Sequence, residues 1–334
     1  MRLPWGLDRL KHRLRRALRG KRSWVWGTAL LLGLVIFPLV GPAYYVAFGL
    51  ALLANVAIAS SWALFSGLTR YLSLASAAFY GAGAYTTAVL LAKLAWPLPI
   101  LAGAVVAALL ALGVGLLSLR LRGPYFAILT FGLSELVRHM VVWYESRFTG
   151  TVGRILLAQP DRRTIYYGLL VIAVAAVSVA ILLYRSRLGL MLLAIGGDEE
   201  RTEVLGVRPT WIKVGVFVLS AMLMGATGAA IAPRWTYIDP QIAFNPLISF
   251  QAVIMALLGG TRRPAGPVIG ALFLGVISEL FLLQFRYVYM MILGAVLILT
   301  VLALPHGITG WYLEERTRDL IRPVRWAIAR RIPR

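Results

Sequence analysis

The side chains of this chain that could do chemistry are few and fall in two places. Four of its 13 acidic residues lie within residues 198–203, in a charged loop between two apolar stretches. Glu135 and Glu279 lie inside apolar stretches, where a carboxylate must face protein or water. The loop suits the docking of a soluble partner, and the two isolated carboxylates suit a pathway for a solute or a proton.

Other kinds of chemistry find no support in the residue pattern. The chain has no cysteine, and its three histidines, His12, His139 and His306, are too far apart for a metal-binding spacing. It contains no phosphate-binding G-x-x-x-x-G-K-[ST] motif and no hydrolase, metalloprotease or cofactor fingerprint. We therefore expect no enzyme and no resident metal or cofactor.

The composition indicates a membrane protein. Of 334 residues, 60% are hydrophobic and 14% are charged, which is typical of a chain that crosses a bilayer several times. Apolar stretches of spanning or near-spanning length occur at about residues 24–41, 43–66, 72–92, 97–119, 124–145, 164–184, 211–233, 247–258, 264–284 and 287–304. The eighth is short enough for a re-entrant or broken helix. We predict an all-α polytopic transmembrane helical bundle of about ten spans.

The positive charges predict the orientation of this bundle. The net charge is +21, and Lys and Arg gather before the first span, in the loop 185–213 and after the last span. The positive-inside rule places all three segments, and therefore both termini, in the cytoplasm. We expect a basic amphipathic segment at 1–23, a transmembrane domain at 24–304 and a basic tail at 305–334. Both end segments suit binding to membrane lipid rather than to nucleic acid.

The acidic part of the loop carries signals of a short helix. Asp198 and Glu199 suit the positive start of a helix, and Gly206 with Pro209 shortly after it suits the end. We predict a helix over residues 198–206. A merely solvated loop is the alternative.

Glu135 allows two interpretations. It lies twelve residues beyond Gly123, or about 18 Å along a helix, near the middle of its expected span. It could line a pathway, or Arg138 and His139, one turn further on, could pair with it. Glu279 has the same ambiguity and no basic residue within one turn.

Small residues at intervals of four predict close packing between helices. Ser73, Ala77 and Gly81 form one such stripe, and Gly266 with Gly270 begins another. The hydroxyls of the Ser73 region could also supply polar points to a pathway.

Three stretches, in order along the chain, resemble the permease subunits of branched-chain amino-acid ABC importers. They are Leu72-Ser73-Leu74 with Ala77-Ala78-Phe79-Tyr80-Gly81 and Gly83-Ala84-Tyr85-Thr86, then Gly123-Pro124-Tyr125-Phe126-Ala127-Ile128-Leu129-Thr130 with Glu135, and finally Ser186-Arg187-Leu188-Gly189 with Ala194-Ile195, Asp198-Glu199 and Glu203-Val204-Leu205-Gly206. The chain departs from the family pattern at Leu190, Leu193 and Gly196, where arginines are usual, and at the turn 259–267.

The resemblance implies a permease subunit of a binding-protein-dependent ABC importer. Such a subunit works with a second permease, two cytoplasmic ATPases that hold ATP and Mg²⁺, and a periplasmic binding protein. The resemblance assigns coupling to the ATPases to Gly189, Asp198, Glu199, Glu200, Glu203 and Gly206. We take Ser73, Ser76, Tyr125, Phe126, Thr130, Glu135 and Glu279 as candidates for the translocation path.

The expected cargo is a branched-chain or other apolar amino acid, with urea and short amides open as alternatives. A proton-coupled secondary transporter, with Glu135 or Glu279 as the proton carrier, is the rival from another class of protein.

Overall fold

The computed structural model describes residues 28–29, 31–121, 123–156, 160–284, 291, 294–295, 298 and 307–310. The chain forms two compact units, Met1–Phe48 and Gly49–Arg334. In the first unit, the helix Leu31–Val40 ends where Pro42, which has no N–H group, follows Gly41. The expected segments 1–23 and 305–334 and the expected last span, 287–304, fall wholly or largely outside the described residues.

The described elements are almost all helices. In chain order they are α2 (Ala43–Trp62), the π-helix η1 (Ala63–Gly67), α3 (Ser76–Leu90), α4 (Leu98–Ser118), α5 (Pro124–Phe148), β1 (Arg154–Ile155), α6 (Arg162–Arg185), α7 (Arg187–Gly197), α8 (Glu199–Val204), α9 (Pro209–Ile231), the 3-10 helix η2 (Ala232–Arg234), β2 (Tyr237–Ile238), α10 (Pro240–Ala243), α11 (Pro246–Gly259) and α12 (Ala265–Gln284). Six helical stretches of the described part are long and apolar enough to cross a membrane. The predicted all-α polytopic architecture is therefore confirmed, whereas the predicted number of about ten spans stays a prediction.

Several helix starts follow from proline and capping residues. Pro124, Pro209 and Pro246 are the first residues of α5, α9 and α11, a position where the fixed φ of proline fits and its missing N–H is not needed. Asn245 caps α11, because its side chain accepts a hydrogen bond of 2.9 Å from the Leu247 N–H. These local signals place the helix starts within about two residues of the starts predicted from hydropathy.

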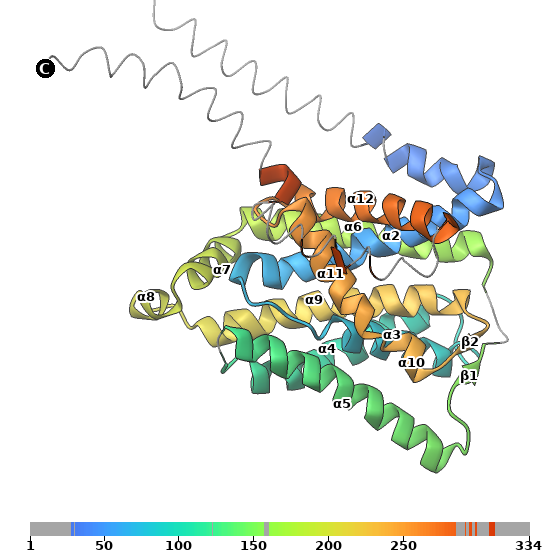
Figure 1. Cartoon of the computed structure of the whole chain (residues 1–334), viewed down its shortest axis with the longest axis horizontal. Helices are drawn as coiled ribbons and strands as arrows, with labels where there is room; N and C mark the ends of the chain where they lie inside the picture. Colours follow the sequence, from blue (N-terminus) through green and yellow to red (C-terminus); the bar gives the residue numbers. More distant parts are fainter. Residues whose placement is uncertain are drawn as a thin grey trace, which may run out of the picture. The chain divides into compact units, whose positions relative to one another are not determined.

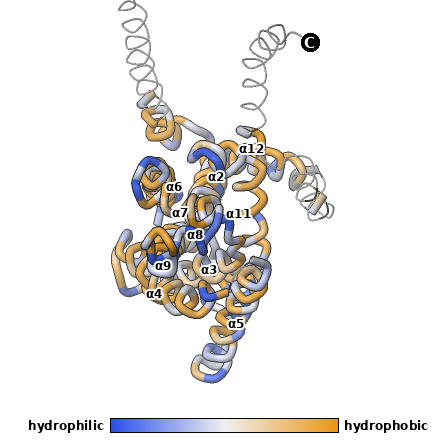
Figure 2. The backbone as a smooth tube through the Cα atoms, turned by 90° about the vertical axis from the view of Figure 1, so that its left-hand side faces the viewer, coloured by the Kyte–Doolittle hydropathy of each residue, from blue (hydrophilic) through white to orange (hydrophobic). Residues whose placement is uncertain are grey.

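The helix α3 lies in the middle of the second unit and packs against α4, α9 and α11 (Figure 2). Backbones approach closely there, because a Cβ atom added at Gly83 would lie 1.9 Å from the carbonyl oxygen of Gly225 in α9. Gly81, which we expected in the packing stripe, faces the ring of Phe244 instead of another backbone. The second predicted stripe does meet a backbone, since a Cβ atom at Gly270 would lie 1.9 Å from the carbonyl oxygen of Met255 in α11.

The short elements mark the two ends of the bundle of the second unit (Figure 1). The helices α7 and α8 lie at one end, called the α8 end below, and the antiparallel pair β1–β2 lies at the other. The strands link the α5–α6 connection to the α9–α10 connection, with Arg154 opposite Ile238.

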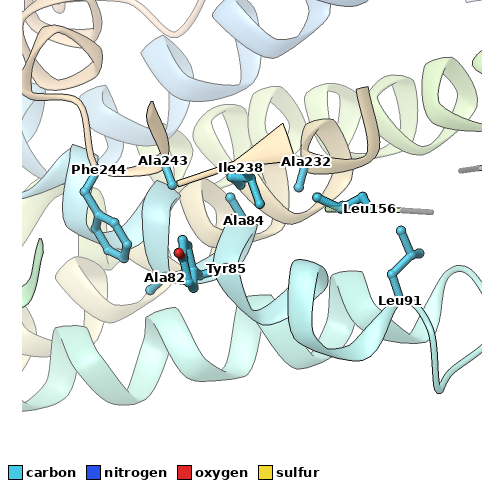
Figure 3. Packing of buried hydrophobic residues seen from close by; sticks show 9 residues of the cluster. All are labelled: Ala82, Ala84, Tyr85, Leu91, Leu156, Ala232, Ile238, Ala243 and Phe244. Atoms are coloured by element: carbon cyan, nitrogen blue, oxygen red, sulfur yellow. The ribbon is translucent and has the colours of Figure 1, made fainter. Parts of the chain in front are cut away.

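Beside the β1–β2 pair, buried apolar side chains from α3, β2 and α10 pack together (Figure 3). The ring of Tyr85 lies next to that of Phe244, with centroids 5.9 Å apart. The cluster consists of Ala82, Ala84, Tyr85, Leu91, Leu156, Ala232, Ile238, Ala243 and Phe244. Its burial closes this end of the bundle with apolar side chains.

Candidate functional site

The helix α8 is the short helix predicted for the acidic loop. Asp198 caps it: its Oδ1 accepts a hydrogen bond of 3.1 Å from the Arg201 N–H, and its other oxygen pairs with the Arg201 Nε at 2.8 Å. Gly206, with φ of +84°, follows the last turn in a conformation that side chains rarely adopt. The loop is therefore ordered, with its acidic start and glycine end in the predicted roles.

The far end of α8 exposes apolar side chains. Val204 is 88% exposed and Leu205 is 81% exposed, and Glu200 and Glu203 on the same helix are also exposed. Figure 2 looks onto this end of the bundle, with the hydrophilic α8 in front of the apolar helices. Exposed apolar side chains beside charged ones on a projecting helix are typical of a surface that another protein covers.

Two glycines allow α7 to pack closely against the backbone of neighbouring segments. A Cβ atom at Gly189 would lie 2.1 Å from the carbonyl oxygen of Leu183, at the end of α6. One at Gly196 would lie 2.6 Å from the carbonyl oxygen of Leu68. Gly196, where the resembling family has an arginine, therefore stands at a contact with no room for a side chain.

The other end of α8 is fixed by a buried ion pair. Glu199, in the first turn, pairs through Oε1 with Lys213 Nζ at 2.7 Å, and its Oε2 accepts a hydrogen bond of 2.5 Å from the Tyr71 hydroxyl. Lys213 lies in α9, and its side chain is 1% exposed. Tyr71 lies in the non-helical residues 70–75, called the α2–α3 break below.

Side-chain hydroxyls stabilise the α2–α3 break. The N–H of Ser73 donates to Ser66 Oγ at 3.3 Å, and that of Leu74 donates to Thr130 Oγ1 at 3.1 Å. Ser249 Oγ of α11 donates to the Leu74 carbonyl oxygen and accepts from the Ala77 N–H, both at 2.8 Å. Hydroxyl groups from η1, α5 and α11 thus pair with backbone groups that have no partner within a helix.

The break runs from the surface at the α8 end into the bundle: Arg70 and Leu72 are exposed, whereas Ser73 and Ala75 are buried. Gly123, before the start of α5, lines a cavity together with residues 195–200 at the α8 end. Thr130 is seven residues further on, about 10 Å deeper along the helix. Figure 1 shows the break running from near α7 into the bundle, where α3 begins. Non-helical backbone at such depth occurs where protein or a water-filled cavity surrounds it.

The path candidates divide into two groups around the break. Ser73 and Thr130 take part in its hydrogen bonds, and Ser76 is the first residue of α3, with a buried Oγ that has no hydrogen-bond partner among the described residues. Phe126 is fully buried, whereas Tyr125 is 70% exposed on the outer face of α5. Ser73, Ser76, Thr130 and Phe126 therefore lie at or near the break, on the buried side of the helices. Tyr125 lies on the exposed side.

Glu135 pairs with Arg138 on its own helix, and each side chain is 24% exposed. One oxygen of Glu135, Oε1, is buried without a hydrogen-bond partner among the described residues. His139, the other predicted neighbour, is exposed. Glu279 lies partly buried in α12, which packs against α11.

Four residues that were not predicted from the sequence stabilise the base of α8, the break or the opposite end of the bundle: Tyr71, Lys213, Ser249 and Glu145. Lys213 carried a usable signal, because a lone lysine just inside an apolar stretch needs an acidic partner, and the acidic loop precedes it. Glu145 is buried at the end of α5, where it accepts a hydrogen bond of 2.8 Å from the Gly153 N–H and pairs with Arg154 Nε at 2.9 Å. Ser249 carried no local signal, since its partners are 172 to 175 residues away.

The chain is similar to known permeases along most of its length. The family described as branched-chain amino acid transport system / permease component matches residues 45–301. The high-affinity branched-chain amino acid transport system permease protein LivM of Salmonella typhimurium is 29% identical in an alignment over 277 residues that covers 72% of this chain and 64% of the relative. LivM of Escherichia coli K12 is 28% identical over the same shares.

A shorter similarity joins the chain to sugar permeases. The ribose import permease protein RbsC of Escherichia coli K12 is 34% identical over 123 residues, 35% of this chain and 38% of the relative. The chain spans 64% of the length of the two LivM proteins. No solved structure matches the chain. The match over residues 45–301 shows that this chain belongs to the family of permease components of branched-chain amino acid transport systems.

Proposed function

We propose that this chain is a transmembrane permease subunit of an ABC importer in the bacterial inner membrane. It would work with a second permease subunit, two cytoplasmic ATPases that hold ATP and Mg²⁺, and a periplasmic binding protein. About ten crossings would place both termini and the α8 end in the cytoplasm, which the distribution of Lys and Arg supports. The β1–β2 end would then face the periplasm.

The main support for this proposal is that α8 is fixed to the bundle at its start and exposes apolar side chains at its end. Its base is fixed to the bundle by Glu199 and Lys213, and its tip presents the exposed Val204 and Leu205. A helix that is anchored at one end and apolar at the other can carry a displacement made by a bound protein into the bundle. ATP would drive the cycle only if the ATPases bind it with different affinity in the two states of the permease.

The α2–α3 break supports a translocation path in this part of the bundle. Its hydroxyl partners, Ser66, Thr130 and Ser249, are polar groups from different helices that gather at one depth. Non-helical backbone of this kind can present its polar groups to a polar solute within a membrane. We propose a branched-chain or other apolar amino acid as cargo, which the names of the LivM relatives support.

The proton-coupled alternative has less support. Its main candidate carrier, Glu135, already has an ion-pair partner in Arg138, so a structural role accounts for this carboxylate. The other candidate, Glu279, lies in a different helix, α12.

Affinity purification of the tagged chain from native membranes, followed by mass spectrometry, tests the assignment. We expect two ATPases, a second permease and, in proteoliposomes with the binding protein, ATP-dependent uptake of leucine but not of ribose or urea. Replacing Val204 and Leu205 by Ser should reduce the recovered ATPase at least tenfold, because these side chains form the proposed contact.

The control variant is Ile155→Ser, which changes an apolar side chain that is 66% exposed at the opposite end of the bundle. It should leave the recovery of the ATPases unchanged. Purification of the chain alone, together with uptake driven by an imposed proton gradient, would overturn the assignment.

A further inference from the structure

We propose that Lys213 and Tyr71 are positioning residues for transport, which fix Glu199 so that α8 and the α2–α3 break move as one body. The proposal rests on the proposed function, because it assigns a role within the ATP-driven cycle. It adds two residues outside the acidic loop to the coupling machinery, and it names the part of the bundle that receives the displacement.

The contacts converge on one point between three elements. Lys213 Nζ lies 2.7 Å from Glu199 Oε1, 3.4 Å from the Tyr71 hydroxyl and 4.7 Å from the centroid of the Tyr71 ring. It also donates a hydrogen bond of 3.3 Å to the carbonyl oxygen of Leu119, just after α4. The lysine therefore ties the base of α8, the break and the end of α4 to α9.

Burial distinguishes this ion pair from the other ion pair of α8. The side chains of Lys213 and Glu199 are 1% and 11% exposed, whereas those of Arg201 and Asp198 are 87% and 43% exposed. Exposed pairs are weak and are screened by salt. A buried pair adds little net stability compared with apolar side chains of the same size, but removing one partner leaves a buried charge. The buried pair therefore suits a role in fixing position.

The surroundings of the contact between Lys213, Glu199 and Tyr71 determine which part of the bundle moves. The helices α3 and α9 meet at Gly83 and Gly225, with backbones in contact and no side chain between them. The break is held by hydroxyl groups, which can exchange one hydrogen-bond partner for another without breaking a helix. A cavity of about 350 Å³ leaves space beside this contact. It is lined by Thr69 to Tyr71, Gly123 and residues 195–200. A force on α8 is therefore passed to α9 through Lys213 and to the break through the Tyr71 hydroxyl, and of these two parts the break is the one that can rearrange.

The first experiment uses the permease alone in lipid nanodiscs and measures hydrogen–deuterium exchange. Lys213→Met and Tyr71→Phe should each raise the exchange rate at least tenfold in residues 71–77 and 198–206 together. The control variant, Arg201→Gln, removes the exposed ion pair of the same helix and should leave residues 71–77 unchanged. Unchanged exchange of residues 71–77 in Lys213→Met would overturn the proposal.

The second experiment uses the full complex in proteoliposomes and measures leucine imported per ATP hydrolysed. The double variant Lys213→Met with Glu199→Met removes both charges, so it should keep the melting temperature of the wild type. We expect its ratio of transport to hydrolysis to fall at least tenfold, while the ATPases still bind. A wild-type ratio in this double variant would show that the pair is merely structural and would overturn the proposal.

The two experiments separate the two proposals. If the wild-type complex shows no ATP-dependent uptake, the proposed function fails, whereas the exchange measurement still tests whether α8 and the α2–α3 break are joined. If the wild type transports and the variants exchange and couple normally, only the positioning role fails.

Discussion

The hydroxyl of Tyr85 donates a hydrogen bond of 2.7 Å to Glu145 Oε2, although 60 residues separate the two in sequence. The same carboxylate holds Gly153 and Arg154 in the connection that contains β1. Glu145 thereby fastens the loop at the β1–β2 end to the central helix α3. The side chain of Glu145 is 2% exposed, so its hydrogen bond with Tyr85 is shielded from water, whereas the side chain of Arg154 is 31% exposed.

Replacing Glu145 should cost more stability than replacing its partner. Tyr85→Phe removes one hydrogen bond, so we expect a loss of about 1 kcal/mol in the free energy of unfolding. Glu145→Leu leaves Arg154 and the Tyr85 hydroxyl without their acceptor, and we expect a loss of about 3 kcal/mol or more. Thermal unfolding in detergent, followed by tryptophan fluorescence, measures both. Tyr144→Phe, a change at an exposed tyrosine of the same helix, is the control and should be neutral.

Gly83→Ala tests the close packing of α3 against α9. The added Cβ atom would lie 1.9 Å from the Gly225 carbonyl oxygen, so the two helices must move apart. We expect a loss at the upper end of the range of about 1–3 kcal/mol that is usual for overpacking, or no accumulation of folded protein. Gly113→Ala is the control, since nothing lies within 4 Å of its added Cβ atom. Equal melting temperatures for the two variants would contradict this packing.

Ser249→Ala should weaken the α2–α3 break. It leaves the Leu74 carbonyl oxygen and the Ala77 N–H without their partner, and each unpaired buried group costs about 1–3 kcal/mol. We expect a lower melting temperature and impaired uptake. Ser249→Thr keeps the hydroxyl and should restore both. Ser60→Ala removes a buried hydroxyl that has no hydrogen-bond partner among the described residues, and it should have little effect.

Glu135 and Arg138 should behave as a structural pair. Glu135→Leu leaves the Arg138 charge unpaired within the span, so we expect less folded protein in the membrane. Adding Arg138→Leu should recover most of the loss and preserve ATP-dependent uptake, because no charge then remains. A double variant that folds but has lost proton-driven uptake, present in the wild type, would identify Glu135 as a proton carrier instead.

The helices were predictable where the signal is local. The apolar stretches 124–145, 211–233 and 247–258 predicted the positions of α5, α9 and α11, which begin at prolines 124, 209 and 246. The acidic loop likewise contains both the cap of α8 and its terminating glycine. The roles assigned to the coupling and path residues stay predictions, because they depend on partners and solutes.

The extension of the α2–α3 break from residue 71 to residue 75 was not predictable. The apolar run 72–92 reads as one continuous span, yet its helix begins only at Ser76. The groups that stabilise the break, Thr130 and Ser249, lie 56 and 175 residues from Leu74 in sequence. No proline or glycine interrupts residues 70–75, so the interruption is a tertiary effect. The pairing of Lys213 with Glu199 likewise depends on how α8 folds back onto α9.

The shortness of α3 bears on how the chain is made. Fifteen residues extend about 22 Å, less than the roughly 30 Å of a bilayer interior, and its alanines, glycines and hydroxyl groups give it little affinity for lipid. As the nascent chain leaves the ribosome, α3 alone is a poor signal for membrane insertion. The next helix, α4, is the most apolar of the six candidate spans of the described part. We expect the two to enter the bilayer together as a hairpin, so synthesis halted before residue 98 should leave α3 outside the membrane.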